Sequence, residues 1–142
     1  MTVDNPVHPS HYKKSETGYE CIDFMELMNC PNLATAFKYV WRYEYKGKPL
    51  EDLNKALYYV DRESELRARW TRPLRFDTAS GQPIGHLPED DLMFEDFHQK
   101  SEKGTQLSVL TAIWYADMTT GGSTLVLADE FLKGLVKETE DD

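Results

Sequence analysis

The sequence has no long apolar stretch and few cysteines. No segment approaches the roughly 20 uncharged apolar residues that cross a bilayer, so we expect no membrane contact. The first residues lack the basic and apolar regions of a signal peptide, so we expect the protein to begin at or near Met1 and to act in the cytoplasm. The two cysteines, Cys21 and Cys30, are too few for a disulfide framework and predict reduced thiols.

Signatures of the common nucleotide-binding and hydrolytic sites are also missing. The chain has no GxxxxGK[ST] phosphate loop and no GxGxxG, GxSxG, HExxH or CxxC motif. A phosphate bound by this protein must therefore be held without a glycine-rich cradle. His8 and His11 lie three residues apart, but no third ligand with supporting spacing is nearby, which favours a structural or substrate-contacting role over a metal site.

Basic residues are fewer than acidic residues, and the difference lies in the second half of the chain. The chain carries 16 Lys+Arg and 25 Asp+Glu, a net charge of −9, which argues against general binding to duplex nucleic acid. Residues 1–72 carry 11 basic and 11 acidic residues, whereas residues 73–142 carry 5 and 14. The neutral half can hold an anion, and the acidic half would repel one.

Apolar residues at helical spacing predict an all-α fold. Helix start and stop signals, with Asn32 and Ser123 as N-cap candidates, place five helices over residues 20–29, 32–45, 49–69, 106–118 and 123–137. The first three are expected to form a three-helix core. The last two are expected to form a C-terminal helical hairpin, appended to that core through a long irregular loop.

The chain therefore divides into four expected regions. Residues 1–19 form an N-terminal arm that contributes to the site, and residues 20–69 form the helical core. Residues 70–104 form an acidic, Pro- and Gly-rich connection, whose composition favours an irregular path over a short hairpin around Ser80-Gly81-Gln82. Residues 105–142 form the helical hairpin and an acidic tail.

One edge of the second expected helix has the strongest signal for ligand binding. Thr35, Lys38 and Arg42 fall in a single stripe at 100° per residue. Two cations and a hydroxyl along one edge suit a phosphate group, and Lys46 and Lys48 extend the cationic rim in the following turn. The alternative is a solvated helical face whose cations pair with carboxylates elsewhere.

Carboxylates at the boundaries of the first and third expected helices are the other candidates. Such groups can hold Mg²⁺, act as a base or orient a neighbouring lysine, and they can equally form interhelical salt bridges. They are Glu20 and Asp23 on the first helix, and Asp52 and Asp61 on the third, where Lys55 and Tyr59 lie nearby.

Four motifs in order resemble a small tailed-phage protein family. They are Pro9-Ser10-His11-Tyr12, Glu20-Cys21-Ile22-Asp23, Lys38-Tyr39-Val40-Trp41-Arg42 with Lys46-Gly47, and Glu51-Asp52-Leu53-Asn54-Lys55-Ala56 with Tyr59. The resemblance covers about residues 5–68 and implies a domain of the [NP]-x-HY … KYxxR … KG … DLxKAxxY type. One branch of that family is described as a nucleotide kinase acting on deoxynucleoside monophosphates.

The resemblance implies one site built by residues of the arm and the three helices. Lys38 and Arg42 would neutralise phosphate oxygens, Tyr12 or Tyr59 would stack on a base, and Asp52 or Asp23 would orient Lys55 or a metal. Where the family shows Gly-Asn, this chain has Ala34-Thr35, so the Thr35 hydroxyl would replace an amide. The implied catalytic residues are Lys38, Arg42, Asp52 and Lys55, and the implied substrate-binding residues are His11, Tyr12, Glu20, Asp23, Thr35, Tyr39, Lys46 and Tyr59.

The leading interpretation is a phage nucleotide-binding protein of the infected host cytoplasm that phosphorylates deoxynucleoside monophosphates without a P-loop. It would use a nucleoside triphosphate as phosphate donor, with Mg²⁺ as a candidate cofactor. One alternative is a non-enzymatic phage effector that binds a host protein through its acidic C-terminal half. Another is a helical nucleotide pyrophosphohydrolase, with Glu20, Asp23, Asp52 and Asp61 holding Mg²⁺.

Aromatic residues on the second and third expected helices also predict a homo-oligomer. A three-helix core of this size cannot cover them all, so part of this surface should meet another subunit. The residues are Phe37, Trp41, Tyr43, Tyr45, Tyr58 and Tyr59.

Overall fold

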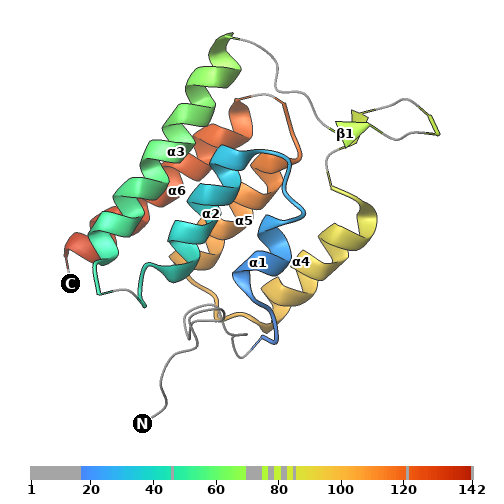
Figure 1. Cartoon of the computed structure of the whole chain (residues 1–142). Coiled ribbons are helices and arrows are strands. Elements are labelled where there is room, and N and C mark those ends of the chain that lie inside the picture. The colour runs from blue at the N-terminus through green and yellow to red at the C-terminus, as the bar shows by residue number, and fades with distance from the viewer. Residues whose placement is uncertain are drawn as a thin grey trace, which may run out of the picture.

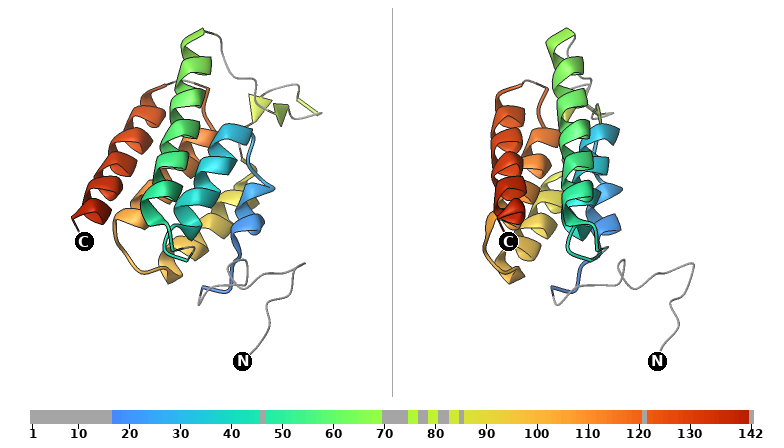
Figure 2. Two further views of the ribbon diagram at one scale, coloured as in Figure 1. Left: turned by 60° about the vertical axis from the view of Figure 1, so that its left-hand side comes forward. Right: turned by 90° about the vertical axis from the view of Figure 1, so that its left-hand side faces the viewer.

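Four helices pack in a closed ring in a computed structural model that describes residues 17–45, 47–69, 75–76, 79–80, 83–84, 86–120 and 122–141. They are α2 (Pro31–Arg42), α3 (Pro49–Arg69), α5 (Thr105–Asp117) and α6 (Ser123–Glu140). Helix α2 packs against α3, α3 against α6, α6 against α5, and α5 against α2. Neighbours in this ring run antiparallel (Figures 1 and 2). The predicted all-α fold class is confirmed.

Two further helices, α1 (Cys21–Met25) and α4 (Pro88–Lys100), lie beside α2 and α5 (Figure 1). The fully buried Phe24 of α1 joins them to the bundle, because its ring centroid lies 5.7 Å from that of Trp114 and 5.5 Å from that of Phe94. Phe94 in turn stacks on Trp114 at 4.9 Å. These aromatic contacts form the centre of the core.

Local sequence explains how α2 and α3 come to lie side by side. Pro31 occupies the first turn of α2, where its missing N–H costs nothing, and Cys30 rather than the predicted Asn32 is the N-cap. Between the helices, Gly47 has a φ of +76°, which glycine adopts without strain. Pro49 then begins α3, with Asp52 among the acidic residues of its first turn.

The predicted irregular connection over residues 70–104 is wrong for its second part, where α4 forms. Pro88 lies in the first turn of that helix, and the acidic residues 89–91 follow it at the end where negative charge is favourable. A short hairpin also exists, because β1 (Arg75–Phe76) pairs antiparallel with β2 (Pro83–Ile84). The proline and glycine content of this segment favoured an irregular path in the prediction, although it is compatible with both elements.

The expected C-terminal hairpin is present, but it completes the core rather than being appended to it. Ile113 and Trp114 of α5 and Leu132 of α6 are fully buried. Helices α5 and α6 thus form half of the ring, and the expected three-helix core does not stand alone. Helix α6 also begins after Gly122, which replaces the predicted Ser123 as N-cap.

This arrangement covers most of the aromatic surface that predicted a homo-oligomer. Phe37, Trp41 and Tyr43 are buried within the chain itself. Aromatic side chains of α1 and α4 cover Phe37 and Trp41. Tyr45 and Tyr58 remain exposed. The expectation of self-association now depends on these two residues.

Candidate functional site

The antiparallel contact between α2 and α3 brings together six of the residues predicted to form the site. Tyr39 of α2 and Tyr59 of α3 mark its middle, because their rings stack with centroids 6.2 Å apart and planes 15° from parallel. The six residues, which we call the Tyr39 cluster, are Lys38, Tyr39, Arg42, Asp52, Lys55 and Tyr59.

Three cations surround the Tyr39 ring. The Nζ of Lys38 and the Cζ of Arg42 each lie 4.8 Å from the ring centroid, and the Nζ of Lys55 lies 5.6 Å from it. At these distances the negative face of the ring attracts the cations and offsets part of their mutual repulsion. Two helices thereby hold three positive charges around one aromatic side chain.

The Arg42 guanidinium is also paired with Asp52 of α3. Its Nε lies 3.7 Å from Oδ2 of Asp52, and the two side chains are 16% and 6% exposed. Both atoms are buried, and neither has a hydrogen-bond partner among the described residues. The pair therefore fixes the direction of the guanidinium but leaves hydrogen-bonding capacity unused.

The remaining charges at this surface leave a positive excess. Glu51 pairs with Lys55 at 3.3 Å and with Lys48 at 3.7 Å. The hydrogen bond from Lys55 and the charge of Lys48 lower the pKa of Glu51, which keeps it ionised. Lys38 has no carboxylate partner among the residues that the structure describes. It is therefore the cation most available to an anionic ligand.

The first turn of α1 lies beside the same cations. Burial raises the pKa of the Cys21 thiol to about 12, against the opposing charges of Lys38 and Arg42. Asp23 of this turn accepts the backbone N–H of Glu20 at 2.8 Å through Oδ2, so this carboxylate caps α1.

Thr35 lies outside the cluster, and three predicted residues are not placed by the structure. The Thr35 hydroxyl donates to the Pro31 carbonyl at 2.9 Å, within its own helix. His11, Tyr12 and Lys46 lie outside the described residues.

The carboxylates predicted to hold Mg²⁺ are not brought together. Burial raises the pKa of Asp61, and Asp129 of α6 raises it further, so Asp61 faces α6 rather than the Tyr39 cluster. Asp52 is committed to Arg42. Within the described ranges no group of three or more His, Cys, Asp or Glu side chains is arranged to hold a metal ion. These residues do not fit a protein-held magnesium site.

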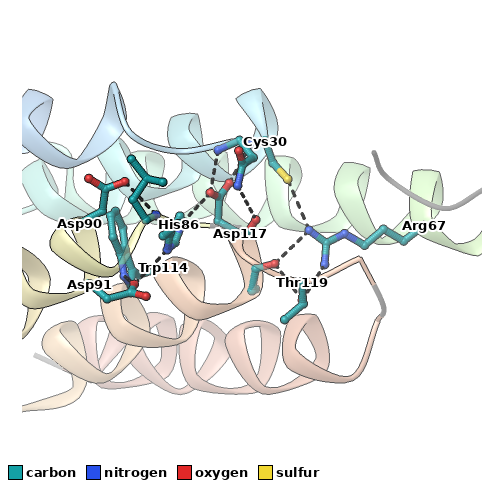
Figure 3. A network of polar contacts seen from close by, with 11 residues as sticks. Cys30, Arg67, His86, Asp90, Asp91, Trp114, Asp117 and Thr119 are labelled. Atoms are coloured by element: carbon teal, nitrogen blue, oxygen red, sulfur yellow. Dashed lines mark hydrogen bonds and ion pairs between the residues drawn. The ribbon is translucent and has the colours of Figure 1, made fainter. Parts of the chain in front are cut away.

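A second polar cluster, not predicted from the sequence, is buried where α2 begins and α5 ends (Figure 3). The carboxylate of Asp117 accepts the backbone N–H groups of Asn29 and Cys30, each at 2.7 Å. Its Oδ2 also lies 2.8 Å from Nε2 of His86, whose Nδ1 lies 3.2 Å from Oδ1 of Asp91. This cluster connects the start of α4 to α2 and α5.

A buried ion pair continues this network to α3. The Nε of Arg67 donates to Glu63 at 2.9 Å, and its Nη2 donates to the Ala116 carbonyl at 3.0 Å. Asn32 of α2 donates to the other oxygen of Glu63 at 3.2 Å. The network therefore joins four helices, but its His86, Asp117, Glu63 and Arg67 side chains are at most 1% exposed. We assign it a structural role, because no ligand reaches it.

A sequence signal for this network did exist. Glu63 continues the core stripe of Ala56 and Val60 along α3, and Asp117 follows Ile113 at core spacing on α5. A charged residue at a core position is rarely buried without partners. These two positions could therefore have been identified as a buried polar network, although their partners could not.

A comparison with protein families gives a match to part of the chain. Residues 7–61, less than half of the chain, are similar to a family described as a protein of unknown function, DUF3310. That description names no activity. No curated protein and no solved structure matches. Separately, none of the described helices is long and apolar enough to cross a membrane.

Proposed function

We propose that the Tyr39 cluster binds the phosphate of a nucleotide, and that the protein phosphorylates deoxynucleoside monophosphates without a P-loop. One observation carries this proposal: three cations from two helices converge on one ring, and Lys38 has no described carboxylate partner. A structural salt-bridge cluster would instead balance each cation locally. The proposed setting is the cytoplasm of a phage-infected cell.

Each side chain of the cluster has a distinct part in this proposal. Lys38 and the outer nitrogens of Arg42 bind phosphate oxygens, because charge-assisted donors bind these oxygens best. Asp52 holds the guanidinium in one orientation, and Glu51 does the same for Lys55. Tyr59, stacked on Tyr39, offers an aromatic surface for the base.

The proposed reaction transfers one phosphoryl group between two nucleotides. An oxygen of the deoxynucleoside monophosphate attacks the γ-phosphorus of a nucleoside triphosphate, and the bond to the leaving nucleoside diphosphate breaks. Such transfer needs mainly positioning and neutralisation of the phosphate oxygens. Cationic helices supply that neutralisation here. The described residues form no magnesium site, so no step is assigned to a protein-held metal.

Product analysis tests the activity. The protein is incubated with each of the four deoxynucleoside monophosphates and ATP, with and without Mg²⁺, and the products are separated by ion-exchange chromatography. A deoxynucleoside diphosphate is expected. Release of monophosphate and pyrophosphate from a deoxynucleoside triphosphate alone would show a pyrophosphohydrolase instead, and absence of any turnover would contradict an enzyme.

A matched pair of variants tests the site. Lys38→Gln removes the cation without a described carboxylate partner and should lower kcat/KM at least about tenfold. Lys48→Gln removes a neighbouring cation that does not contact the Tyr39 ring, is 75% exposed and pairs with Glu51. It should leave the rate near that of the native protein. Equal losses in the two variants would contradict a specific phosphate contact.

A further inference from the structure

An apolar groove lies between α4, α5 and α6, helices that contribute nothing to the Tyr39 cluster. It has a volume of about 240 Å³. His98 of α4, Thr111 and Tyr115 of α5, and Leu127 and Phe131 of α6 line it. The groove continues past Tyr115 into a second hollow that Glu95 of α4 borders.

Three large apolar side chains of this groove are left open to solvent. Leu127 is 45% exposed, Phe131 is 37% exposed and Tyr115 is 36% exposed. The core spacing of α6 predicts Phe131 to be buried with Leu132 and Leu135, but the structure places it at the groove instead. Exposed apolar side chains that gather in one hollow are typical of a surface that a partner covers.

Acidic side chains near the groove come from α4 and from the residue that precedes Phe131 on α6. Burial raises the pKa of Tyr115, and the charges of Asp91 and Glu95 raise it further, so both carboxylates lie close to its hydroxyl. Glu130 precedes Phe131 on α6 and is exposed. Residues 73–142 as a whole carry 5 basic and 14 acidic residues. A second copy docked by the same face would set like charges against each other, which disfavours self-association here.

We propose that this groove binds a cationic amphipathic helix of another protein. The partner's helix can lie along the groove beside α5 and α6 and place its apolar side chains on Tyr115, Leu127 and Phe131. Its lysines and arginines would then meet Glu95 and Glu130. This proposal does not depend on nucleotide binding, since it uses other helices.

A designed peptide tests the surface directly. The probe is a fluorescein-labelled helix of roughly 18 residues built from Leu and Lys in an amphipathic pattern. A peptide of the same composition in scrambled order is the control. Fluorescence anisotropy should show saturable binding of the amphipathic peptide and at least about tenfold weaker binding of the scrambled one.

Two variants on adjacent residues separate groove binding from attraction to an acidic protein. Leu127→Glu places a charge in the groove, whereas Val126→Glu places the same charge next to it, at a side chain that is 58% exposed. The proposal predicts at least about tenfold weaker binding for Leu127→Glu and unchanged or tighter binding for Val126→Glu. Circular dichroism checks that both variants stay folded.

Three results of the binding test would overturn the proposal. They are absence of binding to the native protein, equal binding of the scrambled peptide, and equal responses of the two variants. A native protein that self-associates through this groove, with Leu127→Glu alone monomeric, would also overturn it. Nucleotide binding by Leu127→Glu should match that of the native protein. A negative result for the groove therefore leaves the kinase proposal untouched, and the reverse also holds.

Discussion

The Nε of Arg42 lies 3.7 Å from the Oδ2 of Asp52, close enough for an ion pair but too far for a hydrogen bond. This pair crosses from α2 to α3 within the Tyr39 cluster. It links the stability of the fold to the candidate site, because the residue proposed to bind phosphate also balances a buried carboxylate.

Removal of Asp52 should therefore destabilise the protein. Asp52→Ala leaves the partly buried Arg42 guanidinium without its counter-charge, and breaking a buried pair in this way costs roughly 3 kcal/mol. Asp52→Asn keeps the shape and should cost less. Urea unfolding measures both variants, and a loss below about 1 kcal/mol for Asp52→Ala would show that water satisfies Arg42 in its place.

Removal of the buried Asp117 carboxylate should destabilise the fold more than removal of Asp52. Asp117→Ala leaves His86 and the N–H groups of Asn29 and Cys30 without their acceptor, and such losses amount to roughly 3–5 kcal/mol. The exposed Glu130→Ala serves as the control and should change stability by less than about 0.5 kcal/mol. Similar melting temperatures for the two variants would contradict the structural role of the network.

The thiols should be unreactive in the folded protein. Burial is the main reason that the pKa values of Cys21 and Cys30 rise to about 12, and both side chains are inaccessible. A disulfide reagent at neutral pH should label neither thiol until urea is added, when both of the 2 cysteines react. Rapid labelling of the native protein would contradict their burial.

The same two thiols predict how stability depends on pH. Their pKa values are higher in the folded than in the unfolded chain, so the folded state retains the protons longer. Stability from this source is complete below about pH 8.5 and falls as pH rises toward 12. Cys21→Ala should reduce the slope of this fall, measured by urea unfolding across that range.

Self-association should depend on the aromatic side chains that the chain leaves uncovered. Tyr45 and Tyr58 are 62% and 59% exposed on or next to α2 and α3. We expect light scattering to give a mass above the 16.5 kDa of one chain, and Tyr58→Lys to shift it toward that value. A native mass of 16.5 kDa at micromolar concentration would contradict the expectation.

The sequence predicted the helices that have clear apolar periodicity and clear stops. Leu33, Phe37 and Val40 identify the buried side of α2, and Pro49 identifies the first residue of α3. The end of α2 was predicted less well, because the helix stops at Arg42 and not at residue 45. Helix α4 was not predicted, because Pro88 and the acidic residues that follow it are also typical of a loop. Pro88 in fact lies in the first turn, where both residue types are favourable.

The polar sites were predictable only in part, because sequence patterns indicate which residues share a helix but not which distant segments pack together. Helical spacing predicts that Thr35, Lys38 and Arg42 share one stripe of α2, and the resemblance adds Tyr39, Asp52, Lys55 and Tyr59. The antiparallel packing of α2 and α3 brings all of these except Thr35 together. The buried network could not be assembled in this way. Its members come from segments 29–32, 63–67, 86–91 and 114–119, and only the finished ring of helices brings these segments together.

Calorimetric titration with the four deoxynucleoside monophosphates tests the central claim most directly. Arg42→Lys is the informative variant, because it retains the positive charge beside Asp52 but loses the planar fork that binds phosphate with two hydrogen bonds. At least one nucleotide should bind the native protein. Its affinity should fall at least about tenfold in Arg42→Lys and Lys38→Gln and stay unchanged in Lys48→Gln. Heats of binding that are absent for every nucleotide, or that are equal in the native protein and all three variants, would contradict a phosphate site at the Tyr39 cluster.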